Sequence, residues 1–460
     1  MKKVFAGLLV MLLMVTAVAA QTETVEITFA HIFGGEGDTR GDVVRAIADD
    51  FMAANPNIIV NVESSNIEYT ELFNSALLAA EQGNAPTIVQ IEEGLTQLAI
   101  DSGYFLPISE LASEEQLADI NSDMLEVVRN YYTVDGTLWS VPWNSSNPIL
   151  YYNKSMTDAL GIEISSTEPL TFDEITAICE GVMAAKAAIP TLTHCINWPV
   201  ASWWVEQWLS MQDALYANND NGRSGRASEV YFDSEPVMNI INWWAAMDAA
   251  GYYTYSGTPN NYNGEGALFG SGATALHFNT TAGITLFVGA FEGAGVELGI
   301  APLAIPSESA TNGVTVGGAS VWVSNGQTEA ETQAAVDFIF FLTNAENDIR
   351  WHQGSGYFPN RTSSIETLTT GGYVDPASGA EVSWFETFPF FRVAIDQLAN
   401  SGGTIANSGP IIGPATEVRA ALTQGIQSIL DNDISPAEAM AAAKQSADAI
   451  LADYNSLIGE

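Results

Sequence analysis

The chain has 460 residues, of which 47% are hydrophobic, and 55 acidic residues face only 14 lysines and arginines. The hydrophobic fraction is ample for a folded core, so the formal net charge of −41 indicates an acidic surface rather than disorder. A charge of this sign repels phosphate backbones and argues against nucleic acid as a partner. The length predicts two or three domains.

The first twenty residues have the pattern of an export signal. Two lysines precede an apolar run over residues 4–15, and small residues follow up to Ala20. The run is shorter than the roughly 20 residues that span a bilayer, and no cysteine for a lipid anchor follows it. We therefore expect cleavage after Ala20 and a periplasmic or extracellular protein, with a mature net charge of 12 − 55 = −43.

Beyond the signal, strand and helix patterns alternate. Apolar alternation predicts a strand over 25–29 and helical spacing predicts a helix over 42–51. A second strand is expected at 58–62 and an Ala- and Leu-rich helix at 69–82. The largely apolar run 87–91 is typical of a strand that a parallel sheet buries on both faces. This order predicts an α/β domain with right-handed crossovers.

The later chain changes character twice. A helix-rich block covers 203–251, short strands return between 273 and 323, and the last 130 residues are largely helical. The recurrence predicts two α/β lobes between which the chain crosses more than once. Glycine-rich pieces at 264–266 and 293–295 lack the spacing of a dinucleotide-binding loop and are predicted to be loops.

Sequence signals of catalysis are missing. The chain has no GxSxG elbow, no HExxH pair and no P-loop, and its four histidines share no metal-ligand spacing. We therefore expect neither an enzyme nor a cofactor. Cys179 and Cys195 could form a disulfide in an oxidising compartment or stay a free buried pair. Glu92 and Glu93 end a predicted strand, where neighbouring side chains point to opposite faces. We therefore do not expect them to form a facing catalytic pair, and we expect one of them to accept hydrogen bonds from ligand hydroxyls.

Two further features suggest a polar ligand. The chain carries 11 tryptophans and 15 tyrosines, whose ring faces stack well on the C–H face of a sugar or polyol. Arg392 lies in an aromatic setting, where it could be a paired surface residue or a clamp for phosphate or carboxylate. The segment 279–283 follows a predicted strand and opens a short helix, whose free N–H groups favour anions.

Several longer stretches resemble one family of proteins. They occur in a single order within residues 25–455 and comprise 84–93, 142–154, 317–323 and 351–359. They resemble the extracellular solute-binding proteins of ATP-driven importers, in the cluster that includes maltose-binding protein. The NSS at 144–146 and the GGAS at 317–320 point to the glycerol-3-phosphate-binding branch. The resemblance implies a type II, two-lobe Venus-flytrap fold of the α/β class, without a cofactor.

The resemblance also assigns residues of the first lobe and the hinge to a ligand site. Tyr69 and Glu93 would contact a glycerol moiety, with Glu93 accepting hydrogen bonds from its hydroxyls. Ser145 or Ser146 would donate to the ligand at the hinge, and Gly317 would allow close backbone approach.

The second half of the implied site would stack on the ligand and hold its anionic group. Trp198 would be the stacking wall, with Trp203 as a possible substitute. Thr280 and Thr281 would hold a phosphate, and Tyr357 and Arg392 would complete the clamp.

Three functions are consistent with these features of the sequence. The leading one is a monomeric binding component that delivers sn-glycerol-3-phosphate or a glycerophosphodiester to the transmembrane subunits of an ABC permease. The others are a receptor for an uncharged sugar and a secreted glycan-acting hydrolase. For either receptor function, we expect the first lobe to comprise residues 21–145 and 305–326, and the second lobe to comprise residues 146–304 and 327–460.

Overall fold

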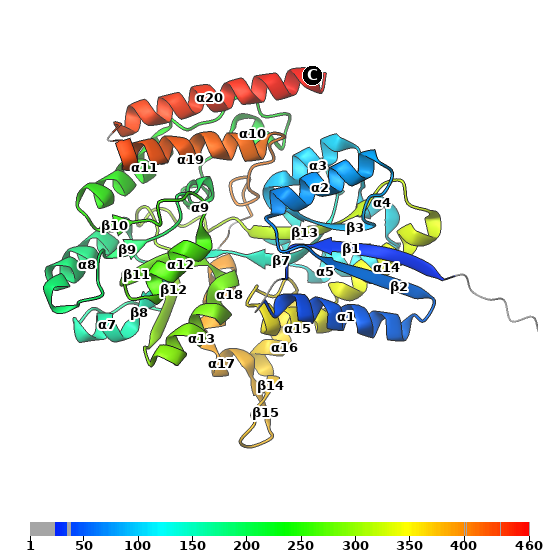
Figure 1. The fold of residues 1–460 in the computed structure, drawn as a ribbon, viewed down its shortest axis with the longest axis horizontal. Coiled ribbons are helices and arrows are strands. Elements are labelled where there is room, and N and C mark those ends of the chain that lie inside the picture. Colours follow the sequence, from blue (N-terminus) through cyan, green and yellow to red (C-terminus); the bar gives the residue numbers. More distant parts are fainter. Residues whose placement is uncertain (1–23, 35–37, 400, 402, 433, 460) are drawn as a thin grey trace, which may run out of the picture.

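Two β-sheets, each flanked by helices, form two lobes that lie side by side (Figure 1). The computed structural model describes residues 24–34, 38–399, 401, 403–432 and 434–459, so the predicted export signal lies outside the described residues. The chain passes between the sheets where β7 leads into β8 and again between β12 and β13. The predicted α/β class with repeated crossing is confirmed.

The first lobe is built on a six-stranded sheet. Its order is β2-β1-β3-β13-β4, and β7 pairs with β13 beside this path. β1 runs parallel to β2 and β3, whereas β13 is antiparallel to its neighbours. Its strands are β1 (Val25–His31), β2 (Ile58–Ser64), β3 (Ile88–Glu92), β4 (Phe105–Leu106), β7 (Val141–Ser146) and β13 (Gly317–Ser324).

Helices cover both faces of this sheet. Ile88 of β3 packs into the core that α1 (Arg40–Ala54) covers, whereas Val89 and Ile91 pack with α2 (Tyr69–Glu81) and α3 (Thr96–Ser102). All three of these β3 side chains are fully buried. The apolar run therefore has the environment that its sequence predicted, because a strand in the middle of such a sheet meets a helix layer on each side.

The second lobe contains a five-stranded sheet in the order β10-β9-β11-β8-β12. Its strands are β8 (Pro148–Asn153), β9 (Ile196–Asn197), β10 (Tyr253–Thr254), β11 (Leu276–Thr280) and β12 (Leu298–Pro302).

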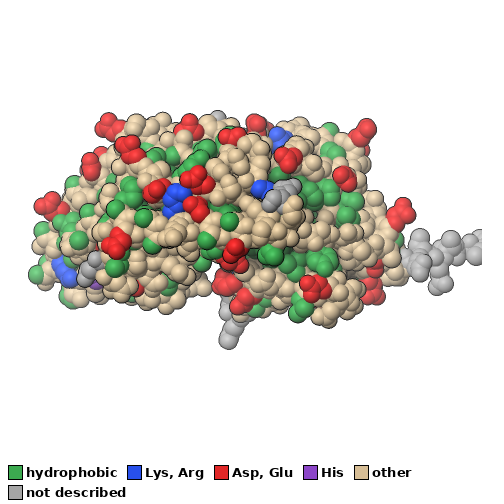
Figure 2. Space-filling model, turned by 90° about the horizontal axis from the view of Figure 1, so that it is seen from above, with side chains coloured by type: hydrophobic (Ala, Val, Ile, Leu, Met, Phe, Trp, Pro, Cys, Tyr) green, Lys and Arg blue, Asp and Glu red, His purple; other side chains and the backbone are tan. Residues whose placement is uncertain are grey.

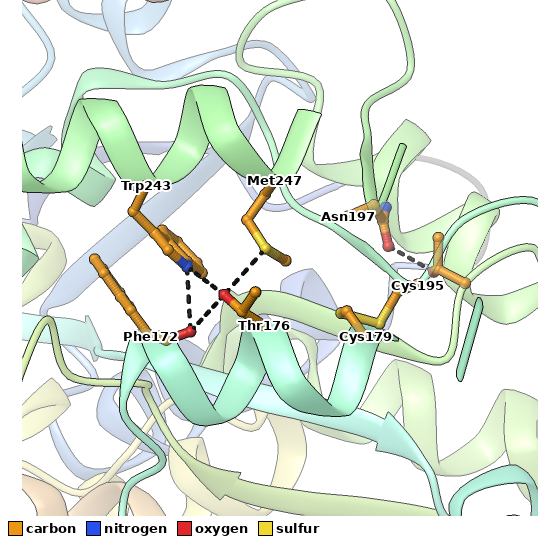
Figure 3. The surroundings of a disulfide bond; sticks show 8 residues. Phe172, Thr176, Cys179, Cys195, Asn197, Trp243 and Met247 are labelled. Atoms are coloured by element: carbon orange, nitrogen blue, oxygen red, sulfur yellow. Dashed lines mark hydrogen bonds between the residues drawn. A yellow bond between two sulfur atoms is a disulfide. The ribbon is translucent and has the colours of Figure 1, made fainter. Parts of the chain in front are cut away.

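A disulfide between Cys179 and Cys195 ties α8 (Phe172–Ala184) to the segment before β9, which settles the state of the two cysteines (Figure 3). On the same helix, Thr176 donates to the Phe172 carbonyl at 2.8 Å and accepts from Trp243 Nε1 of α11 (Glu235–Ala249) at 3.1 Å. The Trp243 ring stacks on Phe172 with centroids 3.7 Å apart. The disulfide thus holds α8 to the segment before β9, and the contacts of Trp243 with Phe172 and Thr176 hold α8 to α11.

A helical hairpin of α19 (Ala415–Asn432) and α20 (Pro436–Leu457) lies over α9 (Ser202–Met211) and α11 at the top of Figure 1.

Acidic side chains are scattered over the face seen from above, with few basic ones among them (Figure 2). No helix in the described part of the chain has the length and apolar character needed to cross a bilayer. Shorter elements complete the fold: α4 (Ile108–Leu111), α5 (Glu114–Asp123), α6 (Glu126–Tyr131), α7 (Lys154–Ala159), α10 (Asn218–Gly222), α12 (Tyr262–Gly270), α13 (Ile284–Ala294), α16 (Thr362–Thr370), α17 (Trp384–Thr387), α18 (Arg392–Ala399), and the hairpins β5–β6 (Thr133–Val134, Thr137–Leu138) and β14–β15 (Gly372–Val374, Glu381–Ser383).

One ion-pair cluster joins the lobes beside α20. Arg226, in the loop after α10, donates from both Nη atoms to the Asp101 carboxylate of α3, each at 2.8 Å. The Tyr454 hydroxyl of α20 donates to the same carboxylate at 2.7 Å. These bonds have to break if α3 moves away from α20, so they oppose separation of the lobes.

Two expectations about the chain's organisation differ from the structure. α14 (Glu329–Leu342) and α15 (Ala345–Ser355) pack against α1, and α14 also packs on β1, so they lie beside the first sheet although the predicted boundary placed them in the second lobe. The glycine-rich pieces predicted as loops are helical: 264–266 lies inside α12, and 293–294 ends α13 before a left-handed cap at Gly295. The Asn261 side chain caps the start of α12, and the buried Phe287 and Phe291 side chains hold α13 in place.

Candidate functional site

Strands β7 and β13, which lead to and from the second lobe, form the hinge. They bring together four predicted site residues: Ser145, Ser146, Gly317 and Glu93. In the β7–β13 pair, Ser146 lies opposite Gly317 and Ser145 opposite Gly318. Gly318 has φ +107°, and a Cβ there would lie 2.0 Å from the Asn144 carbonyl oxygen, so only glycine fits. Its N–H donates to Glu93 Oε2 at 3.1 Å, which fastens the end of β3 to the hinge.

Two predicted stacking residues have different positions. Trp198 is fully buried in the second lobe, where it stacks on Trp243 at 5.5 Å and packs on Tyr253 at 4.2 Å. Trp203 of α9 lies instead against the hinge, because a Cβ on Gly317 would be 2.7 Å from its ring. Trp203 thus lies at the hinge, whereas Trp198 belongs to the core of the second lobe.

A buried arginine that sequence reasoning missed lies where the lobes meet. Arg419 of α19 donates from Nε and Nη2 to both oxygens of Glu206 on α9, at 2.8 and 2.7 Å. Its Nη2 also donates to Glu93 Oε1 at 3.2 Å, and its Nη1 lies 3.9 Å from Glu92. The guanidinium therefore joins a second-lobe helix to the first-lobe strand end. A cavity of about 10 Å³, no larger than one water, lies beside it.

The two adjacent glutamates approach the same guanidinium, contrary to the expectation that they would face apart. β3 ends at Glu92, and a short 3₁₀ turn begins at Glu93, so strand alternation stops between them. Burial, the charge of Glu92 and that of Glu206 outweigh Arg419 and raise the pKa of Glu93 to about 8. The Glu93 carboxyl is therefore largely protonated at neutral pH and can both donate and accept.

Tyr69 and Tyr357 meet at the same junction. Their hydroxyl oxygens are 3.5 Å apart, and Tyr69 also accepts a hydrogen bond from Asn144 Nδ2 at 2.8 Å. Tyr357 stacks on Trp351 with centroids 5.7 Å apart, which fixes its ring. The buried hydroxyl of Ser145, next to Asn144 in the chain, has no hydrogen-bond partner among the described residues.

The predicted phosphate residues lie on the second-lobe side. The Thr281 N–H donates to the Asn147 carbonyl at 2.9 Å, and its hydroxyl accepts from the Asn147 N–H at 3.2 Å, which leaves the hydroxyl proton free to donate. Thr280 donates its own N–H to the Asn279 side chain at 2.7 Å. A Cβ on Gly356, beside Tyr357, would lie 3.5 Å from the Thr281 carbonyl oxygen, so this segment is close to the Tyr357 end of the site.

Arg392 lies on the surface. Its Nε donates to Asp396 at 2.7 Å and its Nη1 to Thr369 at 3.3 Å, and its side chain is 41% exposed. Its guanidinium lies over the Phe385 ring at 5.7 Å. None of these contacts is with another predicted site residue. Among the described residues, no group of His, Cys, Asp and Glu has the geometry to hold a metal ion.

Comparison with known families places these features in context. The family described as bacterial extracellular solute-binding protein matches residues 46–375. The sn-glycerol-3-phosphate-binding periplasmic protein UgpB of Salmonella typhimurium is 26% identical over 424 residues, which are 90% of each chain. UgpB of Pectobacterium atrosepticum is 26% identical over 442 residues, covering 94% of this chain and 92% of the relative.

Solved structures show the same fold at lower identity. The cyclic α-maltosyl-1,6-maltose binding protein of Arthrobacter globiformis has a TM-score of 0.72 and 19% identity, over 94% of this chain and 100% of that one. UgpB of Mycobacterium tuberculosis, in complex with glycerophosphocholine, has a TM-score of 0.71 and 17% identity, over 94% and 99%. The fold is therefore that of the type II periplasmic-binding proteins, and the named relatives are solute-binding proteins.

Proposed function

Because the chain belongs to the bacterial extracellular solute-binding proteins, we propose that it is the exported binding component of an ABC importer and captures sn-glycerol-3-phosphate or a glycerophosphodiester between its lobes. It then delivers this ligand to the transmembrane subunits of a permease. Closure of the lobes excludes water from the ligand, so each polar contact inside is stronger than at an exposed site. We expect the receptor to act as a monomer in the periplasm.

The observation that carries this proposal is the pairing of Arg419 with Glu93 beside the Ser145 hydroxyl, which has no hydrogen-bond partner in the described part of the chain. A glycerol phosphate ester carries hydroxyls, which donate, and a phosphate, which only accepts. The Glu93 carboxyl can accept from the hydroxyls, and Ser145, Tyr69 and Arg419 can donate to the phosphate. The glycerol-phosphate-binding names of the relatives support the same ligand class.

A second candidate is an uncharged sugar. Three acidic side chains, those of Glu92, Glu93 and Glu206, lie around the one guanidinium of Arg419, an arrangement that favours ligand hydroxyls over a further negative charge. Structures with this fold include one with bound maltose and one of a protein named for binding a cyclic maltose derivative.

A thermal-shift screen separates the two candidates. The panel contains sn-glycerol-3-phosphate, glycerophosphocholine, inorganic phosphate, glycerol and maltose at equal concentration. A ligand at 100 times its dissociation constant stabilises the folded protein by about 2.7 kcal/mol. We expect the two glycerol esters to raise the melting temperature. A shift with maltose and none with either ester would reject the glycerol phosphate and favour the sugar.

A separate incubation with candidate substrates tests for catalysis. A receptor binds its ligand without turnover, so incubation with the glycerol esters and with aryl glycosides should release no product. Turnover of an aryl glycoside that is lost in Glu93→Gln would instead establish a hydrolase.

A further inference from the structure

A directional series of hydrogen bonds runs from the first-lobe backbone to Tyr69. The N–H of Ile32, just after β1, donates to Gln90 Oε1 at 2.8 Å. Gln90 Nε2 donates to Asn144 Oδ1 at 2.8 Å, and Asn144 Nδ2 donates to the Tyr69 oxygen at 2.8 Å. The side chains of Gln90 and Asn144 are fully buried, so water does not compete for these bonds.

The direction of the series follows from its first member. A backbone N–H can only donate, so the Gln90 amide has to present its oxygen to Ile32 and its nitrogen to Asn144. Asn144 then has to accept with its oxygen, and its nitrogen faces Tyr69. The Tyr69 oxygen is consequently an acceptor on this side, and its proton points away from Asn144.

We propose that Gln90 and Asn144 are positioning residues that turn Tyr69 into an obligatory hydrogen-bond donor, so that the site selects a ligand with an acceptor oxygen at this point. This inference rests on the proposed function, since it takes the ligand to lie at the Tyr69–Tyr357 junction. The ligand groups that fit are phosphoryl, carboxylate, carbonyl and hydroxyl oxygens. An ammonium or an amide N–H at this point would face a donor and be rejected.

The surroundings of Tyr69 keep this donor available. Burial raises the pKa of the Tyr69 phenol well above its ordinary value, so the phenol retains its proton. The oxygen of Tyr357 is 3.5 Å away, longer than the usual 2.7–2.8 Å of an O–H···O bond, so this contact binds the proton weakly. A ligand oxygen that accepts from both phenols would replace a weak bond with two ordinary ones.

A spectroscopic test needs no ligand. The ultraviolet resonance Raman doublet of tyrosine distinguishes a phenol that mainly accepts from one that mainly donates, and subtracting the Tyr69→Phe spectrum isolates Tyr69. We expect an acceptor-type signature in the ligand-free wild type and a donor-type signature in Asn144→Asp, whose carboxylate can accept the phenol proton. A donor-type signature in the wild type would overturn the inference, whatever the ligand is.

A binding test uses sn-glycerol-3-phosphate as the probe. We expect Asn144→Asp to weaken its affinity about 10- to 100-fold, the loss typical of one hydrogen bond to a charged group. In a Tyr69→Phe background the same change should have little further effect, because it acts through the phenol. Asn61→Asp on the exposed side of β2 adds the same charge and serves as the control.

The two arms separate the possible failures. An undiminished Asn144→Asp effect in the Tyr69→Phe background would show that the charge acts directly, and would overturn the inference. If the wild type binds no glycerol ester, the proposed function fails, and the Raman signature of Tyr69 still decides the direction of the hydrogen bonds.

Discussion

The buried carboxyl of Glu93 should make the folding stability of the protein depend on pH in an unusual direction. Glu93 is only 2% exposed and lies beside Glu92 and Glu206, with Arg419 as the compensating charge. Its pKa rises from 4.5 to about 8 in the folded state. The folded protein therefore binds this proton more tightly than the unfolded chain does.

The sign and size of the effect follow from linkage. Since the folded pKa is raised, the stabilising contribution is complete below pH 4.5 and is lost as the pH rises through 8. At about 1.4 kcal/mol per pH unit, the whole loss approaches about 5 kcal/mol. Glu93→Gln replaces the protonated carboxyl by a neutral group of similar shape, so this pH dependence should disappear from the variant.

The assay is urea denaturation of the wild type and Glu93→Gln at half-unit steps from pH 4.5 to 8.5. We expect the wild type to lose free energy of unfolding relative to the variant at each step up to about pH 8. Glu308→Gln, at an exposed position, removes one acidic group as a control and should run parallel to the wild type. Parallel curves for the wild type and Glu93→Gln would refute the burial of Glu93 at the lobe junction.

Three further predictions concern the joints of the fold. Gly317→Ala places a methyl group against Trp203, and the resulting overpacking of about 1–3 kcal/mol should weaken ligand affinity, as measured by titration calorimetry. Gly289 has open space around it, so the control variant Gly289→Ala should leave the affinity unchanged. Asp101→Asn should weaken the interaction between this side chain and Arg226 by about 1–3 kcal/mol and raise the radius of gyration in small-angle scattering. An unchanged radius would mean that this cluster does not hold the lobes together. Replacing both disulfide cysteines by alanine should lower the free energy of unfolding by about 3 kcal/mol in urea, since the bond closes a loop with a sequence separation of 16; unchanged stability would contradict its structural role.

Local signals predicted the elements well. The strands predicted at 25–29, 58–62 and 87–91 are β1, β2 and β3, and the helices predicted at 42–51 and 69–82 are α1 and α2. These features depend on residues a few positions apart, which the sequence displays directly. The glycine-rich pieces failed because their helices are held by tertiary packing, which overrides the low helix propensity of glycine.

Arginine assignments show where sequence reasoning stops. Arg392 has aromatic neighbours in sequence, but an α-helix turns its side chain towards Asp396 one turn later and towards solvent. Arg419 stands in an unremarkable helical stretch, and only the packing of α19 on α9 brings it to Glu206 and Glu93. The scarcity of cations was the one available signal, since each arginine in so acidic a chain had to be considered.

Trp198 and Trp203 illustrate the same limit. They are five positions apart, and the sequence left both open as the stacking wall. The distinction depends on Gly317, more than a hundred residues away, whose missing side chain admits Trp203 to the hinge.

We propose that the ligand binds at the lobe junction beside Arg419. Isothermal titration of sn-glycerol-3-phosphate into Arg419→Gln and Arg392→Gln tests it directly, because both variants remove one positive charge and only one of these charges lies at the junction. We predict that Arg419→Gln weakens binding at least 10-fold, with the loss of a charge-assisted hydrogen bond worth about 1.5–3 kcal/mol, and that Arg392→Gln binds like the wild type. Loss of binding in Arg392→Gln with wild-type affinity in Arg419→Gln would show that the ligand binds beside Arg392 and not at the lobe junction.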